Sequence, residues 1–252
     1  MKISQSLIKH AGEHLEGSDM DFFERVWNSP ADNYHDRLKA IDFQNKDCVL
    51  DAGFGMGQWT LPYANMNKEL FGIEYSEARV KAVKKLMAGI DIDNIHIAQG
   101  SIEDLPYDEN MFDAVFCYSV LFLTDYKKAL QEFYRVLKPG GKLYFTANGL
   151  GWYLFCLIEN HNKSDSYDPR VMASNTISHT IDVLSGEKIK PGNQVILTHS
   201  RLKSVLKDIG FLSMEIGHDG ELTVNGNIPA KSFYSRQEYL SYPMIFECIA
   251  TK

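Results

Sequence analysis

Three glycines and an acid lie close together at residues 48–62, which read Cys-Val-Leu-Asp-Ala-Gly-Phe-Gly-Met-Gly-Gln-Trp-Thr-Leu-Pro. A short apolar run ends at Asp51, and Gly53, Gly55 and Gly57 follow at alternate positions. Glycine lets the backbone turn tightly and admits a ligand where a Cβ would collide. A buried strand followed by a glycine-rich turn and a helix is how α/β proteins form a nucleotide crevice. We therefore expect a nucleotide-like ligand at this turn.

The spacing of the glycines separates two classes of ligand. In the dinucleotide fingerprint the third glycine follows the second by three residues, and the pyrophosphate lies at the helix N-terminus. Here that position is Gln58, and the third glycine comes earlier. The carboxylate of Asp51 would repel a pyrophosphate but attract an ammonium group. The turn therefore favours a phosphate-free, zwitterionic nucleotide such as S-adenosylmethionine, and it disfavours a nicotinamide dehydrogenase.

Alternating apolar runs and amphipathic segments would position this turn. Strands are expected at 47–52, 69–74, 95–99, 112–119, 142–147, 211–216 and 244–250, and helices at 57–66, 77–89, 126–137 and 200–209. Within 77–89, Val80, Val83 and Met87 fall on one face, as in an amphipathic helix. This alternation predicts an α/β protein with a doubly wound, Rossmann-like parallel sheet of seven strands and right-handed crossovers.

Segments outside the alternation suggest the domain organisation. Residues 1–45 are expected to form a helical N-terminal cap or lid in front of one Rossmann-like domain at 46–252. Two stretches interrupt that domain, at about 148–197 and 218–243. The first begins with aromatic residues, is too apolar for a linker, and should contain a helix at about 170–185. We expect both stretches to cover a substrate at the carboxyl edge of the sheet.

Charge and cysteine usage narrow the class of protein. The chain has 252 residues and a formal net charge of −7, and because nucleic-acid binding draws on clustered Lys and Arg, no nucleic-acid partner is expected. The four cysteines lie far apart without a Cys-x-x-Cys unit, which disfavours zinc, iron–sulfur and disulfide sites. No signal-peptide-like region or membrane-spanning run is visible, so a cytoplasmic protein without a membrane partner is expected.

Five motifs in a fixed order make the chain similar to a known family. They are Val49-Leu50-Asp51-Ala52-Gly53-Phe54-Gly55-Met56-Gly57, Gly72-Ile73-Glu74-Tyr75-Ser76, Gly100-Ser101-Ile102-Glu103-Asp104-Leu105-Pro106-Tyr107, Phe112-Asp113-Ala114-Val115 and Arg135-Val136-Leu137-Lys138-Pro139-Gly140-Gly141. The chain resembles the class I S-adenosylmethionine-dependent methyltransferases, strongly over 46–147 and loosely over 199–252. The resemblance implies S-adenosylmethionine as cofactor, S-adenosylhomocysteine as product, and no metal.

The resemblance assigns roles position by position. Its implied cofactor-binding residues are Asp51, Ala52, Gly53, Phe54, Gly55, Gly57, Glu74, Tyr75, Ser101, Ile102 and Cys117. Asp51 is expected near the ammonium group, which the carbonyl of Cys117 would also accept. Glu74 would accept hydrogen bonds from both ribose hydroxyls, since a carboxylate is a bidentate acceptor. Tyr75 would flank the adenine, whose edge Ser101 would contact.

Three positions depart from the family's usual pattern. Ser101 stands where relatives often carry an Asp that accepts from the adenine amino group. Phe122 and Leu123 stand where a histidine, a familiar base, often follows the fourth strand. Cys117-Tyr118-Ser119-Val120 replaces the Asn/Asp-Pro-Pro-Tyr/Phe motif, which disfavours methylation of amino groups in nucleic-acid bases or protein glutamine.

The acceptor side is less constrained, because a sulfonium methyl group is already activated and the enzyme mainly aligns the reactants and excludes water. A hydroxyl acceptor also benefits from a general base. His179 is the candidate base, and Tyr118, Trp152 and Tyr153 are candidate substrate-wall residues. We predict methyl transfer to oxygen or nitrogen of a small molecule, with a sugar or secondary metabolite expected by analogy. A non-catalytic scaffold that regulates a partner and an RNA or protein methyltransferase are the alternatives.

Overall fold

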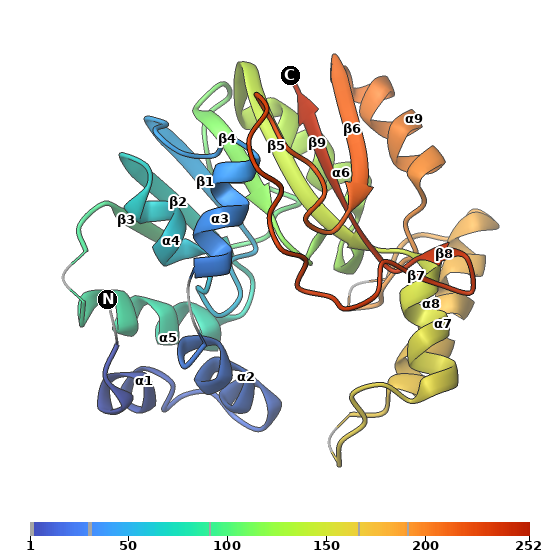
Figure 1. The fold of residues 1–252 in the computed structure, drawn as a ribbon, viewed down its shortest axis with the longest axis horizontal. Coiled ribbons are helices and arrows are strands. Elements are labelled where there is room, and N and C mark those ends of the chain that lie inside the picture. Colours follow the sequence, from blue (N-terminus) through green and yellow to red (C-terminus); the bar gives the residue numbers. More distant parts are fainter. Residues whose placement is uncertain (1–2, 30–31, 91, 166, 191) are drawn as a thin grey trace.

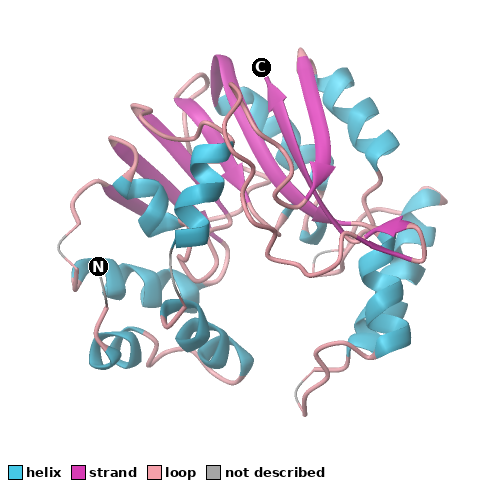
Figure 2. Cartoon of the chain, in the orientation of Figure 1, coloured by secondary structure: helices cyan, strands magenta, loops and turns pink. Residues whose placement is uncertain are grey.

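A seven-stranded sheet forms the centre of the molecule (Figure 1, Figure 2). The computed structural model describes residues 3–29, 32–90, 92–165, 167–190 and 192–252. In spatial order the strands are β3 (Ile95–Gln99), β2 (Glu69–Glu74), β1 (Cys48–Ala52), β4 (Phe112–Cys117), β5 (Leu137–Asn148), β9 (Ile245–Thr251) and β6 (Ser213–His218). The predicted α/β, Rossmann-like sheet of seven strands is confirmed.

One strand runs against the others, which corrects the expectation of a wholly parallel sheet. β9 pairs antiparallel with both β5 and β6, with Tyr144 opposite Ile249 and Ile216 opposite Cys248. The strands from β3 to β5 pair in parallel. The antiparallel direction of β9 follows from the length and type of the connection that leads to it from β6. Parallel neighbours need a crossover, usually through a helix, whereas the chain returns from β6 to β9 without one.

β5 begins five residues earlier than the sequence suggests, at Leu137 in place of Lys142. Leu137 pairs with Phe112, and the register then shifts so that Lys142 pairs with Ala114. The intervening residues form a bulge, which Gly140 permits because its φ is +78°. The expected tight turn at Pro139-Gly140-Gly141 is therefore an irregularity within the strand.

Helices cover both faces of the sheet (Figure 1). They include α4 (Thr60–Asn65), α5 (Glu77–Ala88), α6 (Tyr126–Val136) and α9 (His199–Ile209). Phe133 of α6 and Leu206 of α9 pack with Val115 on one face. Tyr63 of α4 packs with Phe116 on the other. Apolar side chains of β4 are thus buried on both faces, as expected for a central strand.

The N-terminal helices are α1 (Gln5–Ala11), α2 (Ser18–Trp27) and α3 (Asp32–Ala40). The first two pack on α5, and Asp19 of α2 holds Arg79 through two hydrogen bonds of 2.8 Å. α3 instead lies on the sheet, where Leu38 joins the cluster around Tyr63. The segment expected as one cap therefore consists of a pair of helices beside α5 and a separate helix on the sheet.

The insertion after β5 is a helical hairpin of α7 (Leu150–Glu159) and α8 (Pro169–Leu184). The second elaboration crosses in front of the sheet as a loop and ends in a small ribbon, β7 (Glu238–Tyr239) with β8 (Tyr242–Pro243), which packs against α7 (Figure 1). Across the described ranges, no helix combines the length and hydrophobicity that a membrane span requires.

Candidate functional site

The turn after β1 has one open side. Gly53, Gly55 and Gly57 have φ values of +78°, +57° and +79°, so each occupies a conformation that other residues avoid. A Cβ on Gly53 would lie 2.6 Å from Val120, and one on Gly57 would lie 3.0 Å from Val83. A Cβ on Gly55 would meet nothing within 4 Å. Gly53 and Gly57 thus permit close packing, whereas Gly55 leaves space beside the backbone for a ligand.

Glu74 at the end of β2 reaches across to this turn. It is 7% exposed. Its Oε2 accepts a hydrogen bond from the backbone N–H of Gly55 at 3.1 Å, and its Oε1 accepts one from the N–H of Ser76 at 2.9 Å. Each carboxylate oxygen can accept a further bond. The side chain is therefore held in place with two acceptor atoms that could bind adjacent hydroxyl groups.

Asp51 is a buried carboxylate that accepts a hydrogen bond from the hydroxyl of Thr60 at 2.8 Å. Burial raises the pKa of Asp51 to about 7; the negative charge of Glu74 adds to the shift and the Thr60 bond opposes it. A cation placed beside Asp51 would favour its charged form. The two acids and the open turn can therefore hold a ligand that carries one cationic group and neighbouring hydroxyls.

The remaining residues predicted to bind the cofactor differ in how far their side chains are exposed. Tyr75 is 79% exposed, so its ring is available to flank a ligand. Ser101 is half-buried and its hydroxyl accepts the N–H of Glu103 at 3.1 Å, while Ile102 is buried. Ala52 and Cys117 end β1 and β4, whose carboxyl ends lie side by side. Their backbone groups are the atoms that could contact a ligand.

Phe54 departs from its expected role. Its ring is buried and lies in the cluster between the N-terminal helices and α5. A Cβ on Gly72 would come within 3.0 Å of it. The aromatic side chain therefore anchors the turn to β2, because an apolar ring is stabilised by burial there. Only the backbone of Phe54 is left to contact a ligand.

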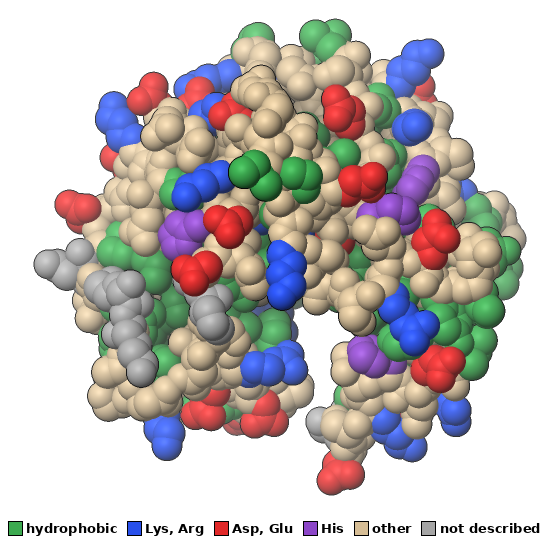
Figure 3. All heavy atoms as spheres, in the orientation of Figure 1, with side chains coloured by type: hydrophobic (Ala, Val, Ile, Leu, Met, Phe, Trp, Pro, Cys, Tyr) green, Lys and Arg blue, Asp and Glu red, His purple; other side chains and the backbone are tan. Residues whose placement is uncertain are grey.

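α2 closes one side of the turn. The indole N–H of Trp27 donates to the backbone carbonyl of Met56 at 2.9 Å. Figure 3 shows a hollow between the lobe that contains α1 and α2 and the lobe that contains α7 and α8, at the edge where the parallel strands end. Ligands of open α/β sheets bind outside the carboxyl ends of the strands. The hollow is therefore where a cofactor and its acceptor would meet.

Two of the three predicted substrate-wall residues surround a third aromatic residue that the sequence did not single out. Tyr118 and Trp152 are both half-buried. The hydroxyl of Tyr118 donates to Asp219 at 3.3 Å, and the ring of Tyr234 meets Trp152 edge-on with centroids 5.9 Å apart. Tyr153 is different, because it is fully buried and its hydroxyl donates to Gln194 at 2.9 Å. Tyr153 belongs to the core of the α7–α8 hairpin, which corrects its predicted role.

His179 is also buried, and both of its ring nitrogens have backbone partners. Nδ1 lies 3.0 Å from the carbonyl of Gln194, and Nε2 accepts the N–H of Lys190 at 3.1 Å. A ring bound in this way is the neutral Nδ1–H tautomer, with no nitrogen left for an acceptor. These contacts conflict with the expected base role. They fit a structural one, in which His179 attaches α8 to the segment before α9.

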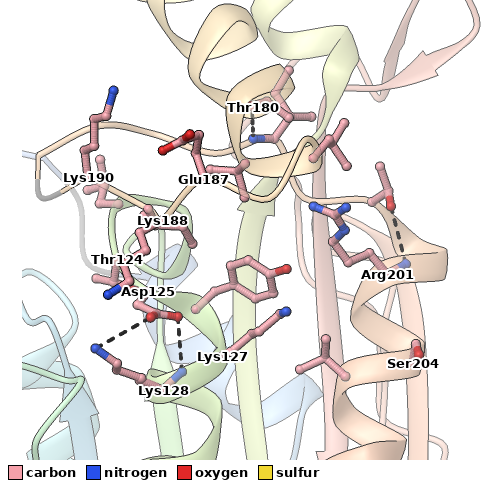
Figure 4. A pocket seen from close by; sticks show the side chains of 18 of the residues that line it. Thr124, Asp125, Lys127, Lys128, Thr180, Glu187, Lys188, Lys190, Arg201 and Ser204 are labelled. Atoms are coloured by element: carbon pink, nitrogen blue, oxygen red, sulfur yellow. Dashed lines mark hydrogen bonds and ion pairs between the residues drawn. The ribbon is translucent and has the colours of Figure 1, made fainter.

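A large cavity lies away from this site. Its volume is about 1180 Å³, and it is lined by the start of α6, the end of α8 and the start of α9. Figure 4 shows Lys127, Lys128, Lys188 and Arg201 around it. None of its described lining residues comes from the glycine turn or from β2. The position of Glu74 and Gly55 therefore indicates the cofactor site, whereas the largest described cavity lies elsewhere.

Residues 50–145 match a family model described as a methyltransferase domain. A demethylmenaquinone methyltransferase of Shouchella clausii is 35% identical over 112 residues, which are 43% of this chain and 48% of that protein. Residues 50–145 therefore form a methyltransferase domain, and the chain is similar to S-adenosylmethionine-dependent methyltransferases. A second demethylmenaquinone methyltransferase, from Oceanobacillus iheyensis, is 29% identical over 112 residues. The chain thus aligns with about half the length of these relatives.

Solved structures show the same fold over more of the chain. A methyltransferase of Thermotoga maritima, described as a possible histamine N-methyltransferase, superposes with a TM-score of 0.56 at 19% identity, covering 97% of this chain and 99% of that one. A phosphoethanolamine N-methyltransferase of Haemonchus contortus, bound to S-adenosylhomocysteine, gives 0.58 at 18% identity, covering 84% of this chain and 46% of that one. These likenesses confirm the fold of the methyltransferase domain and its extension through the C-terminal strands.

Proposed function

We propose that this chain transfers a methyl group from S-adenosylmethionine to a small-molecule acceptor. The observation that carries the proposal is the arrangement around Gly55, whose N–H is held by Glu74 and whose Cβ position is open space. A Cβ there would occupy the room that a ligand needs. Asp51, whose carboxylate is buried and whose pKa burial raises, suits the ammonium group of the same ligand. The match of residues 50–145 to a methyltransferase domain supports this choice of cofactor.

When bound, S-adenosylmethionine supplies an electrophilic methyl group on a sulfonium. The residues of the chain would hold and orient its ends. Glu74 binds the ribose hydroxyls, Asp51 the ammonium group, and Tyr75 one face of the adenine. An acceptor bound in the hollow between the lobes of α1–α2 and α7–α8 would exclude water from the methyl group, which favours transfer to the acceptor over hydrolysis.

The acceptor is proposed from the residues at the hollow and from the relatives. Tyr118, Trp152 and Tyr234 present aromatic surface, which favours a flat organic metabolite over a sugar, the two acceptor classes expected by analogy. Transfer to oxygen or nitrogen is our first candidate. Transfer to a ring carbon of a quinol is the second, because both relatives named above are called demethylmenaquinone methyltransferases.

The test is calorimetric titration with S-adenosylmethionine and S-adenosylhomocysteine, followed by transfer of a tritiated methyl group into a cell extract. We expect micromolar binding of both and label in the small-molecule fraction. Absence of binding, with and without extract, would favour a scaffold that kept the fold without its chemistry. Label in RNA or protein would favour a macromolecular methyltransferase. Locating the label on oxygen, nitrogen or carbon by mass spectrometry separates the two acceptor candidates.

A further inference from the structure

The large cavity between α6, α8 and α9 takes no part in the proposed methyl transfer. Its volume of about 1180 Å³ is above the range of about 300–1,000 Å³ that is usual for pockets that bind small organic molecules. Apolar side chains from several elements line part of it: Leu123, Leu150, Val183, Ile189, Ile196 and Val205. Three of them, Val183, Ile189 and Val205, are partly buried and pack against the main core. A ligand with an apolar body would therefore find both room and a surface to bury.

The lining of the cavity has the opposite charge balance to the whole chain. Among its described residues five are cationic, namely Lys127, Lys128, Lys188, Lys190 and Arg201. Four of its described residues are acidic, namely Glu103, Asp125, Glu187 and Asp208. The whole chain has 33 acidic and 26 basic residues and a formal net charge of −7. A local excess of cations on an acidic protein favours a negatively charged ligand.

Most of these acids already have partners within the protein. Asp125 accepts from the N–H of Lys128 at 3.5 Å and pairs with its Nζ at 3.7 Å. Glu103 accepts from the N–H of Asp125 at 2.9 Å, and Asp208 accepts from a hydroxyl one turn earlier in α9 at 3.5 Å. Glu187 is exposed in the turn after α8. The four cations other than Lys128 form no ion pair with any residue that the structure describes.

Lys127 and Arg201 are directed into the cavity from two different helices. Figure 4 shows the charged ends of both side chains in the space between α6, α8 and α9, whereas Lys190 points away from it. Burial raises the pKa of Tyr126 and the charge of Arg201 opposes that rise, which places these two side chains close together. Because Tyr126 directly precedes Lys127, two cations converge where α6 and α9 begin. Such a pair suits a doubly charged anion, and the planar fork of Arg binds phosphate oxygens in pairs.

We propose that this cavity is a second binding site, for a phosphate monoester that carries an apolar body. Lys127 and Arg201 hold the phosphate, and Val183, Ile189 and Val205 contact the apolar part. The site lies apart from that of the methyl donor, since none of its described lining residues comes from the glycine turn or from β2. A free organic phosphate and the headgroup of a lipid such as phosphatidic acid share this chemistry.

The test is calorimetric titration of the full chain with three probes that share one hydrocarbon chain, each below its micelle-forming concentration. Near pH 8 octyl phosphate is doubly charged, octanoate is singly charged and octyl glucoside is neutral. We expect octyl phosphate to bind at least about tenfold more tightly than either, since only its phosphate can engage both cations. Inorganic phosphate, which lacks the apolar body, should also bind at least about tenfold more weakly than octyl phosphate.

Two variants test the cations directly. Lys127→Gln and Arg201→Gln should each weaken octyl phosphate binding by about tenfold, the loss expected for one hydrogen bond to a charged group. Lys203→Gln removes an exposed lysine of α9 that lies outside the lining, and this matched control should change the affinity by less than about twofold. Thermal melting of each variant separates lost binding from lost folding. S-adenosylhomocysteine at saturation should not displace octyl phosphate.

Vesicles distinguish the two sources of the phosphate. Co-sedimentation with vesicles of phosphatidic acid and phosphatidylcholine, but not of phosphatidylcholine alone, would assign the site to a membrane lipid if both glutamine variants lose it. Octyl phosphate binding without co-sedimentation would assign the site to a free phosphate. Equal affinity for the three octyl probes, unchanged affinity in both variants, or displacement by S-adenosylhomocysteine would overturn the inference. None of these results depends on methyl transfer, which its own titration tests.

Discussion

The guanidinium Nη1 of Arg37 lies 2.8 Å from Oδ1 of Asp219, and the two side chains are 0% and 2% exposed. The same nitrogen is 2.9 Å from Oε2 of Glu247, which is also fully buried. Tyr144 lies between them and donates to Glu247 at 2.7 Å. This network joins α3, β5, β9 and the 218–243 loop. It therefore attaches the N-terminal segment to the loop that carries Tyr234.

Replacing Arg37 by Met should destabilise the protein severely. The change leaves Asp219 and Glu247 buried without their cation, and breaking a buried pair in this way costs about 3–5 kcal/mol. Urea denaturation at neutral pH measures the loss. Arg25→Met, at an exposed arginine of α2, is the control and should stay within about 0.5 kcal/mol of the wild type.

The cost of Arg37→Met should also depend on pH. Burial raises the pKa of Glu247, and Arg37 is the main influence that opposes the shift. Without Arg37 the pKa rises further, so the folded variant binds a proton more readily than the unfolded chain, and its stability increases as the pH falls. The difference from wild type should therefore be smaller at pH 5 than at pH 8. A constant difference would contradict this account.

Glu74→Ala should weaken S-adenosylhomocysteine binding by more than tenfold. Hydrogen bonds to a charged group contribute about 1.5–3 kcal/mol each, and the ribose would lose two. The variant also frees the N–H groups of Gly55 and Ser76. Glu69→Ala, at the other end of β2, removes a surface carboxylate paired with His96 and serves as the calorimetric control. Unchanged affinity in Glu74→Ala would remove the ribose assignment.

Gly55→Ala and Gly140→Ala form a matched pair. Both glycines have positive φ, +57° and +78°, and a Cβ at either meets no protein atom within 4 Å. Each alanine should cost about 1–2 kcal/mol of stability through the left-handed backbone alone. Only Gly55→Ala should abolish cofactor binding, because only there does the open space belong to the ligand. Equal binding by the two variants would show that the ligand lies elsewhere.

Cofactor affinity should rise between pH 6 and pH 8. With its pKa near 7, Asp51 is mostly protonated at pH 6 and mostly ionised at pH 8. An ammonium group binds the ionised form, so affinity increases by about tenfold over this interval and protons are released on binding. Calorimetry in buffers of different ionisation enthalpy measures that release. Asp51→Asn should bind weakly at both pH values, without the dependence.

The raised pKa of Asp51 has a second consequence, for stability without ligand. Because the folded state binds this proton more tightly than the unfolded state, the free protein should lose stability as the pH rises from about 4 to 7. Asp51→Asn removes the titrating group and should flatten that slope in urea denaturation. A wild-type slope that the substitution leaves unchanged would assign the effect to other groups.

His179→Ala should lower the free energy of unfolding and leave the rate of methyl transfer unchanged. Two hydrogen bonds to the backbone are lost, which leaves the N–H of Lys190 without its partner at a cost of about 1–3 kcal/mol. Cofactor affinity and the turnover of folded protein should stay near wild type. A fall in turnover with unchanged melting temperature would restore His179 as the base.

Local sequence was enough to indicate the residues around the glycine turn where we propose that the cofactor binds. The residue type alone allows a positive φ at Gly53, Gly55 and Gly57. The two acids, Asp51 and Glu74, each lie at the end of an apolar run. Because parallel strands place their carboxyl ends at one edge of the sheet, these residues had to converge once the alternation of strands and helices was recognised. The seven strands followed from the same periodicity, apart from the bulge that Gly140 permits in β5.

The acceptor half was decided by tertiary structure. Tyr234 meets the ring of Trp152 from about eighty positions further along the chain, and nothing in its local sequence marks it. The residue types of His179 and Tyr153 are typical of site residues. In the structure, however, buried His179 is hydrogen-bonded to the backbone and Tyr153 lies in the core of the α7–α8 hairpin. A side chain's role depends on what surrounds it. On the acceptor side, those surroundings are formed by loops and by a helical hairpin. Their sequences have no hydrophobic periodicity that predicts their packing, so the contacts are known only from the folded structure.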